Sequence, residues 1–348
     1  MDYTKQYINN SVIIEDKKKE VCVVSEQTFS SLSSLTTYKK VVDISKHHKI
    51  YGLTQNDYNE VLEKIKKQNC FLEYNYIYDK ISGTQIPLKD LVISANHNPN
   101  RYHALIQNRI NTLSNEAKEK NLSPLFMTLT LPSEFHKMKI DKKTKTLIAN
   151  PKYNHVTPKE AVKHLTKMFS RLRHDRSLKE LSKDERIYFR VNEPHKNGTP
   201  HTHVLLFVPK SSINRVVTAF KRLFDNKAND IQTNIENATS YIMKYINKTL
   251  PLSKKENLSK KDKYLNAWYC KHRIIRFNCS RTLAPLSLYR LLHEKFNLKE
   301  LTSLVKKKSL AIFVLQTNRN KIMEIFFGDE LIYQRSKNYT LKNGLLDF

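Results

Sequence analysis

The clearest pattern in the chain is the segment Tyr188–Pro209, in which two alternating apolar and polar runs flank the turn sequence Lys-Asn-Gly-Thr. Asn-Gly between such runs is a strong signal for a β-hairpin. Because strand side chains alternate between faces, His201 and His203 must point to the same side. If the turn is centred on the Asn-Gly pair, Glu193 lies opposite His201. A register shifted by one residue would instead bring up Pro194 and leave Glu193 diagonal.

Alternation and helical spacing divide the rest of the chain into further elements. The run Leu125–Leu131 alternates cleanly before Pro132, which predicts a strand. Its two threonines, Thr128 and Thr130, share a face that could line a site. Capping sequences and apolar spacing predict helices after Thr54, over Asn96–Asn121 and Pro158–His174, after Ser211 or Ser212, and over Tyr241–Lys248. Strands and helices in this order predict an α+β fold, with a central antiparallel β-sheet and flanking helices.

The ends of the chain carry weaker patterns. Residues 1–95 are assigned to an N-terminal accessory region, residues 96–285 to the main domain, and residues 286–348 to a C-terminal accessory region. Within these regions, Cys70–Tyr74 is interpreted as a short β-like run. Leu252–Lys263 is interpreted as a basic, polar linker because charged residues and serine dominate it.

The helix predicted over Tyr241–Lys248 carries two tyrosines, Tyr241 and Tyr245, one turn apart and therefore on one face. Aromatic residues at this spacing commonly pack in a core. Here Ile242 and Ile246 provide an alternative stripe for burial, which leaves the tyrosines free to face elsewhere. Two lysines form a neighbouring cationic stripe, Lys244 and Lys248.

The charge balance points to a polyanionic partner. The chain has 61 Lys and Arg against 33 Asp and Glu, a formal net charge of +28. Such a field attracts polyanions, most commonly a phosphate backbone, although a lysine-biased composition would also contribute. Arg273 and Arg276, which lie beside aromatic residues, could contact phosphates or bases; equally, the nearby Trp268 could simply anchor this segment to the core.

Composition excludes several other classes. With 39% apolar residues the 348-residue chain can bury a substantial core. Its four cysteines are scattered, without the spacing of a zinc ribbon or a disulfide scaffold: Cys22, Cys70, Cys270 and Cys279. No run of eighteen apolar residues occurs, so no membrane association is expected. We expect a reducing, cytoplasmic location.

Together the hairpin, the tyrosine helix and the charge suggest one mechanism. Two imidazoles and a carboxylate leave coordination positions open, so a bound divalent ion could act as a Lewis acid on a scissile phosphate. A tyrosine hydroxyl would then attack phosphorus. Because its free pKa is about 10, the phenol needs help, which the ion and nearby Lys244 could give to the developing phenolate. The product, a phosphotyrosine, could be resealed without ATP.

The sequence resembles the HUH endonucleases, and within them the rolling-circle replication initiators of the phage replication gene A protein family. The resemblance covers about residues 100–285. Three segments carry it: Phe126–Pro132 resembles the first motif, Glu193–His203 the metal motif, and Tyr241–Lys248 the two-tyrosine motif. Arg273–Phe277 also resembles a segment downstream in that family. The metal motif precedes the tyrosines, which is the order of replication initiators, whereas conjugative relaxases typically place the tyrosine first.

The resemblance implies an HUH, ferredoxin-like nuclease domain in which His201, His203 and Glu193 bind Mg²⁺ or Mn²⁺. It also implies that Tyr241 and Tyr245 are nucleophiles in a metal-dependent nicking and joining of single-stranded DNA at a replication origin. One tyrosine would keep the 5′ phosphate and release a 3′-OH primer. The second would act at termination, when the displaced strand is cut and circularised.

The resemblance further implies that Lys244 assists with phosphate or phenolate charge, that a host helicase could be a partner, and that the host is bacterial. Three alternatives remain open from the residues: a transposase of an insertion element with the same chemistry, a non-catalytic single-stranded nucleic-acid-binding protein, and a zinc or iron enzyme built on the His/His/Glu triad. The last would leave the tyrosine pair and the charge unexplained.

Overall fold

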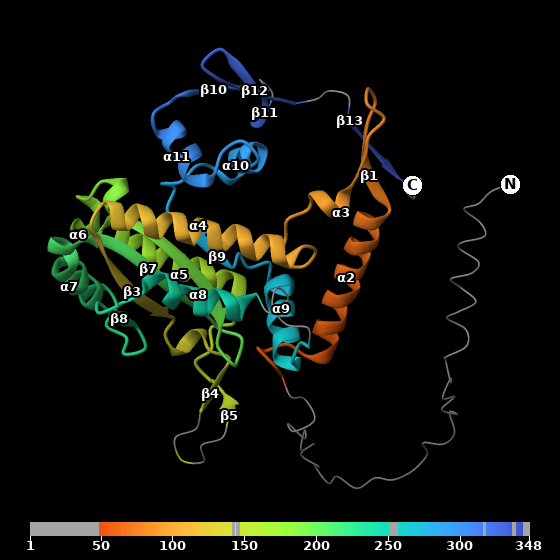
Figure 1. Ribbon diagram of the computed structural model, residues 1–348. Coiled ribbons are helices and arrows are strands. Elements are labelled where there is room, and N and C mark those ends of the chain that lie inside the picture. The colour runs from red at the N-terminus through yellow and green to blue at the C-terminus, as the bar shows by residue number, and fades with distance from the viewer. Residues whose placement is uncertain are drawn as a thin grey trace, which may run out of the picture. The chain divides into compact units, whose positions relative to one another are not determined.

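A computed structural model describes residues 49–140, 143, 147–250, 257–315, 318–335 and 339–343 (Figure 1). All of them belong to one compact unit, Ser45–Phe348. Its centre is a five-stranded sheet with the strand order β8-β3-β7-β6-β9. The strands are β3 (Leu122–Thr130), β6 (Ile187–Pro194), β7 (Pro200–Pro209), β8 (Asp230–Gln232) and β9 (Phe277–Cys279), and each neighbouring pair is antiparallel. The predicted α+β fold with a central antiparallel sheet is confirmed.

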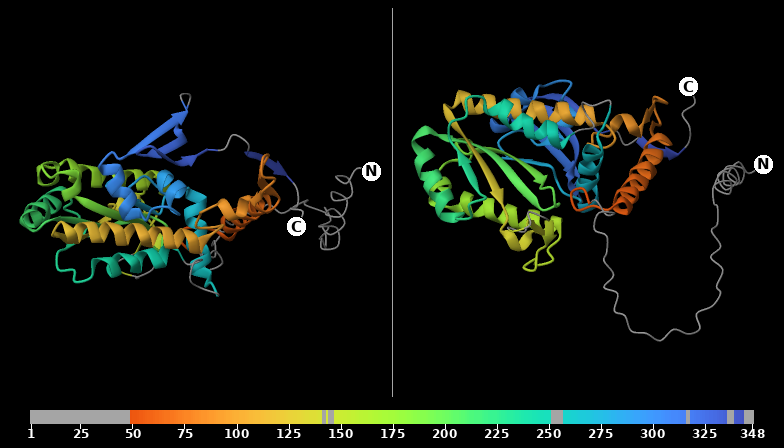
Figure 2. Two further views of the ribbon diagram at one scale, coloured as in Figure 1. Left: turned by 45° about the horizontal axis from the view of Figure 1, so that its top comes forward. Right: turned by 90° about the horizontal axis from the view of Figure 1, so that it is seen from below.

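Helices cover both faces of this sheet (Figure 2). Helix α4 (Pro99–Glu119) and the tyrosine helix α8 (Ala238–Thr249) pack on one face, where alternate sheet residues such as Phe126 and Leu205 are buried. Helices α5 (Pro158–His174) and α7 (Ile213–Leu223) pack on the other face. Because strand residues alternate between the two cores, each strand position is assigned to one side, and the histidines fall on the α4–α8 side.

Local sequence explains where several helices begin. Four of them start with a capping box, in which the cap residue and the third helical residue satisfy each other's backbone N–H groups. They are α2 (Gln55–Glu73), α5, α9 (Lys260–His272) and α11 (Leu298–Lys306), capped by Thr54, Thr157, Ser259 and Asn297. The predicted start after Thr54 and the predicted helix Pro158–His174 are confirmed.

Smaller elements surround the sheet. The strands are β1 (Asn75–Asp79), β2 (Gln85–Pro87) and β13 (Tyr339–Asn343) in one sheet, β4 (Met138–Ile140) with β5 (Leu147–Ala149), and β10 (Leu310–Leu315), β11 (Asn318–Phe327) and β12 (Glu330–Gln334) in another. The short helices are α3 (Leu88–Leu91), α6 (Arg176–Lys179) and α10 (Leu286–Leu292), with 3-10 turns at Ser133–Phe135, Lys183–Glu185 and Lys210–Ser212. Across the described residues, no helix has both the length and the apolar character that crossing a bilayer requires.

Two local predictions are wrong. Cys70–Tyr74 is not a strand, because Cys70–Glu73 forms the last turn of α2 and Tyr74 is its C-cap. The polar linker does not extend to Lys263, because Ser259 caps α9 and the helix continues through the charged residues that follow. The proposed domain boundaries at residues 95 and 285 stay predictions.

A third core joins α2 to α9 and positions the β6–β7 turn. Trp268 on α9 is fully buried beside Leu53 and Val61, and its indole N–H donates to the carbonyl of Gly198 at 3.0 Å. Gly198 has a φ of +89° and packs against the backbone of Tyr51. The anchoring role of Trp268 is therefore confirmed, and it fixes the turn from outside the hairpin.

The close approach at this turn predicts that Gly198→Ala destabilises the protein. An added Cβ would meet the Tyr51 carbonyl oxygen at 2.4 Å, and the positive φ adds strain. The matched control is Gly83→Ala, because Gly83 has a φ of +70° but nothing within 4 Å of the added Cβ. We expect Gly83→Ala to cost about 1 kcal/mol and Gly198→Ala at least about 1 kcal/mol more in urea unfolding. Equal losses would contradict the packing argument.

Candidate functional site

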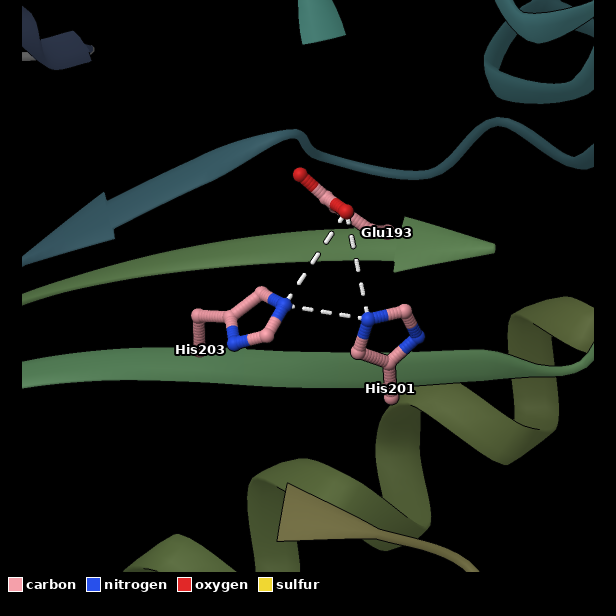
Figure 3. Close-up of side chains that lie close together, drawn as sticks. All are labelled: Glu193, His201 and His203. Carbon is pink, nitrogen blue, oxygen red and sulfur yellow. Dashed lines mark hydrogen bonds and ion pairs between the residues drawn. The ribbon is translucent and has the colours of Figure 1, made fainter. Parts of the chain in front are cut away.

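The β6–β7 register brings three potential ligands together. Glu193 is paired with His201, and Val191 with His203, as the Asn-Gly turn predicts. Figure 3 shows the carboxylate and the two imidazoles converging. The Nε2 atoms of His201 and His203 are 3.0 Å apart, and each lies 3.9 Å from Oε2 of Glu193. The alternative register, with Pro194 in this position, is wrong: Pro194 pairs with Pro200 at the end of the hairpin.

Burial keeps the two imidazoles neutral. Burial lowers the pKa of His203 to about 3, with Lys248 and His195 adding to the effect. The pKa of His201 is also far below its ordinary value, mainly through burial and secondly through the nearby His203. Neutral imidazoles have a lone pair available for a metal ion. Burial raises the pKa of Glu193, and Lys248 opposes that shift.

Neighbouring side chains orient the imidazoles. Thr128, which the strand pattern placed on the site-lining face, forms a 3.1 Å hydrogen bond with Nδ1 of His203. When Nδ1–H donates to the threonine hydroxyl, the Nε2 lone pair points to the centre of the triad. His195 packs on His201 with the ring centroids 4.2 Å apart. These contacts define the ring planes without occupying the converging nitrogens.

Two lysines of α8 differ in their relation to the triad. Nζ of Lys248 lies 2.6 Å from Oε2 of Glu193, a carboxylate whose side chain is only 1% exposed. Lys244, predicted to assist with charge, is exposed, and among the described residues it has no ion pair. The sequence placed both lysines beside the tyrosines, but only a contact between α8 and β6 distinguishes them.

In helix α8 the isoleucines are buried and the tyrosines lie on a different face, as the isoleucine stripe predicts. Ile242 and Ile246 are fully buried, and Tyr241 and Tyr245 lie on the side toward the sheet, partly exposed. The ring of Tyr245 lies against that of His203, with the centroids 4.0 Å apart. The hydroxyl of Tyr241 donates to Gln232 at 3.1 Å. Tyr245 is therefore the tyrosine beside the triad in this conformation.

Phe126 holds the aromatic side chains together. Its ring stacks on the rings of Tyr245 and His203. It contacts the ring of Tyr241 edge-on, with the two ring centroids 4.5 Å apart. Burial raises the pKa of Tyr245, and the proximity of Tyr241 and of the carboxylates of Glu193 and Asp230 raises it further. The Tyr245 hydroxyl is therefore protonated near neutral pH.

The donor set fits a divalent cation. Oε1 of Glu193 is buried and has no hydrogen-bond partner, and the three candidate ligand atoms lie within 4.8 Å of one another. A cation between them would give this carboxylate a partner and separate the two Nε2 atoms, which otherwise need a proton to share. Two imidazoles with a carboxylate suit a divalent transition ion such as Mn²⁺, and the carboxylate also suits Mg²⁺.

Sequence reasoning missed residues that long-range packing brings to the site. Phe126 sits in the predicted first strand, but its contact with both tyrosines depends on how α8 docks. Gln232 belongs to a three-residue strand too short for a periodic signal. His195 lies two residues after Glu193, and strand alternation, which would place both side chains on one face, was the available clue.

One arginine of the downstream segment Arg273–Phe277, Arg276, has a structural role. Arg276 is buried and donates to the Thr249 carbonyl and to Oδ1 of Asn266, at 2.5 and 2.6 Å. Its guanidinium also lies 4.0 Å from the centroid of the Tyr269 ring. Because these contacts are internal, Arg276 links the end of α8 to α9 and is not available to DNA. The phosphate-contact interpretation is thus wrong for Arg276.

Comparison with known proteins identifies the family that the sequence motifs resemble. Residues 33–252 match the family model described as bacteriophage replication gene A protein. Similar proteins include the replication protein of Haemophilus phage HP1, 32% identical over 48% of this chain and 22% of that protein, and the replication gene A protein of Escherichia phage 186, 28% identical over 60% and 31%. A probable replication endonuclease from a prophage-like region of Salmonella typhi is 26% identical over 63% and 30%.

The chain thus spans between a fifth and a third of the length of these curated relatives. No solved structure gives a significant match. The family match covers well over half of the chain and includes the histidine hairpin and the tyrosine helix. The chain belongs to the bacteriophage replication gene A protein family.

Proposed function

We propose that this protein nicks and rejoins single-stranded DNA at a rolling-circle replication origin, with a tyrosine as nucleophile. The observation that carries the proposal is the position of Tyr245 beside the triad of Glu193, His201 and His203. The ring centroids of Tyr245 and His203 are 4.0 Å apart. A replication endonuclease is also what several relatives are named. The net charge of +28 supports a nucleic-acid substrate.

The triad would hold the divalent ion through Nε2 of His201, Nε2 of His203 and a carboxylate oxygen of Glu193. When bound, Mg²⁺ or Mn²⁺ would supply Lewis-acid stabilisation of the scissile phosphate. Thr128 keeps the His203 ring oriented for this role. Phe126 and the buried isoleucines of α8 hold the tyrosines beside the ligands.

The covalent step conserves the energy of the phosphodiester bond, because one phosphate ester replaces another. The hydroxyl oxygen of Tyr245 attacks phosphorus, the Tyr O–P bond forms as the P–O3′ bond breaks, and the released 3′ oxygen ends as a hydroxyl. The proton lost by tyrosine balances the proton gained by this leaving group. The product is a 5′-phosphotyrosine, and attack by a 3′-OH on it reverses the reaction without ATP. Tyr241 supplies a second nucleophile one helical turn away.

Removal of both tyrosine hydroxyls should abolish a covalent protein–DNA product. We expect wild type with Mn²⁺ and a pool of single-stranded oligonucleotides to form a denaturation-resistant species. The double variant Tyr241→Phe with Tyr245→Phe should lose it by on the order of 100-fold or more, with Tyr245→Phe the more severe single variant for the first cut. A non-catalytic DNA-binding protein would give no adduct in any variant. An adduct that survives in the double variant would contradict the nucleophile assignment.

Loss of one imidazole should separate metal binding from DNA binding. His201→Ala is expected to weaken Mn²⁺ binding at least about 10-fold in calorimetry and to abolish nicking, while DNA affinity stays largely unchanged. The reason is that lysines and arginines elsewhere supply most phosphate contacts. His97→Ala is the control, because His97 contacts Asn69 and lies outside the triad. Equal losses of DNA binding and Mn²⁺ binding in His201→Ala would argue against the assignment.

Lys248 and a metal ion should compete for the same carboxylate oxygen. We expect Lys248→Gln to bind Mn²⁺ about 3- to 5-fold more tightly, because the ammonium no longer pairs with Oε2 of Glu193. The Lys248 side chain is 57% exposed, so solvent screens the pair and keeps the effect small. Lys244→Gln, one turn away, removes the same charge and should leave Mn²⁺ affinity unchanged. Weaker Mn²⁺ binding in Lys248→Gln would mean that the lysine instead supports Glu193.

A further inference from the structure

A second candidate binding site lies on the face of the sheet opposite to the triad. A cavity of about 660 Å³ is formed where the end of α5 and α6 meet strands β6 and β7. Tyr188 and Leu206 form its floor and pack toward the α5–α7 core, whereas Glu193 and the histidines face α4 and α8. Its rim is basic: Arg173, His174, Lys179, Lys183, Arg186 and Arg281.

The arginines and lysines of this rim lack acidic partners among the residues that the structure describes. None of the described residues that line the cavity is acidic. Arg173, Lys179 and Arg281 form no ion pair among the described residues, and neither does Lys183. The carboxylates closest in sequence are already engaged: Asp175 by Arg222, Glu180 by Arg215, Asp184 by Lys120 and Lys306, and Glu185 by the backbone N–H of Ser182. The positive charge is therefore available to an external anion.

The cavity wall is held by backbone contacts. Nη1 of Arg186 donates to the carbonyls of Arg173 and Leu178, at 3.3 and 2.8 Å, and closes the junction between α5 and α6. On the other side, the Ser280 N–H donates to the carbonyl of Tyr188 at 2.9 Å. This hydrogen bond extends the β9 edge of the sheet and fixes the position at which Arg281 leaves it. The arginines thus project from a rigid frame.

Buried positive charge lies directly behind the rim. Arg190 is 9% exposed, its Nε has no hydrogen-bond partner, and its guanidinium lies 5.1 Å from the centroid of the Phe169 ring. Arg173 contacts the same ring, at 5.6 Å, and its Nε is likewise buried and unpartnered. Two adjacent guanidinium groups without a carboxylate are costly, and an anion at the rim would offset that cost.

We propose that this cavity binds a backbone phosphate of the DNA strand, at a point remote from the cut. Tyr188 is five residues from Glu193 on β6, and its partner Leu206 is three residues from His203 on β7, so the two sites are roughly 10 to 16 Å apart along the strands and on opposite faces of the sheet. A single phosphate cannot occupy both, and a DNA strand must extend over several nucleotides to reach from one to the other. The inference rests on the proposed nicking function for its choice of anion.

A second cavity adjoins the first. It has a volume of about 800 Å³, shares Lys183 and Arg281 with the first, and extends past Arg109 toward α11. One carboxylate, Asp184, also lines it and is paired with Lys120 and Lys306. Guanidinium groups bind phosphate in a bidentate manner, and the ammonium groups add charge without a geometric requirement. The expected ligand is therefore a phosphodiester of unspecified sequence, held for position and not for base recognition.

Three rim residues, Lys179, Lys183 and Arg281, are exposed and can be changed without disturbing the core, whereas Arg173 is half-buried against Phe169 and is changed separately. We would compare wild type with the triple variant Lys179→Gln, Lys183→Gln, Arg281→Gln, and with Arg173→Gln as a separate variant. The control is Arg171→Gln, which removes one charge from the exposed side of the same helix and does not line the cavity. Binding of labelled oligonucleotides of about 8 and about 30 nucleotides is measured across a salt series, with single-stranded and duplex forms.

We expect the triple variant to bind the long oligonucleotide about 10-fold or more weakly and the short one nearly normally. For the single strand, the slope of log Kobs against log salt should fall by about 0.7 for each phosphate that the variant no longer neutralises. Arg173→Gln should shift both quantities in the same direction. A larger loss with duplex than with single strand would place the phosphate in flanking duplex DNA.

Two outcomes distinguish this inference from the proposed function. Unchanged affinity and salt slope in the triple variant, with normal adduct formation by wild type, would overturn the second site and leave the nicking function standing. Weakened binding in the variants, with no adduct formed by wild type, would support the phosphate site and remove the nuclease proposal. Equal losses in Arg171→Gln and Arg173→Gln would reduce the effect to net charge and also overturn the site.

Discussion

The antiparallel register between β6 and β7 is the constraint on which the site depends. Side chains alternate along a strand, so a shift of one residue would move both histidines to the other core and replace the carboxylate by a proline. Hydrogen bonds within the hairpin do not fix this alone. The turn is also held from outside, where Trp268 donates to Gly198 and the backbone of Tyr51 closes against it. Segments far apart in sequence therefore specify which residue faces His201.

Burial gives the triad its chemistry and also creates its main cost. Removing the imidazoles from water depresses their pKa values and keeps them as neutral ligands. The same environment is unfavourable for the Glu193 carboxylate, which has one oxygen on Lys248 and the other without a partner. A buried carboxylate that is only half satisfied is stabilised by any cation that reaches it. The lysine and a divalent ion are thus alternative solutions to one electrostatic problem.

Local patterns predicted much of the fold, and long-range contacts account for what they missed. Alternation and the Asn-Gly turn predicted the hairpin, and the isoleucine stripe predicted which face of α8 bears the tyrosines. Capping boxes predicted helix starts because they are satisfied within four residues. The β-like interpretation of Cys70–Tyr74 failed because a short apolar run has no distinct period, and here it completes the last turn of α2.

The candidate site was predictable as a set of residues but not as an arrangement of roles. Lys244 and Lys248 are equivalent in the sequence, each close to a tyrosine on the same helix, and only the docking of α8 on β6 places Lys248 on Glu193. Likewise, alternation shows that Thr128 shares a face with its neighbours, but the β3–β7 register is needed to set it opposite His203. The side-chain partners of a site assembled from three elements are tertiary information.

The sheet would separate the two proposed tasks, nicking and phosphate binding, which would interfere on one surface. In the proposed mechanism the ligands are two buried neutral imidazoles and a carboxylate, and a dense group of arginines beside them would compete for the scissile phosphate. The α4–α8 side carries the aromatic residues and the triad, with Lys248 as the only cation paired to it among the described residues. The unpaired arginines gather on the α5–α6 side instead. If a DNA phosphate is held there as proposed, it would fix where along the DNA strand the tyrosine acts, without altering the electrostatics around the triad.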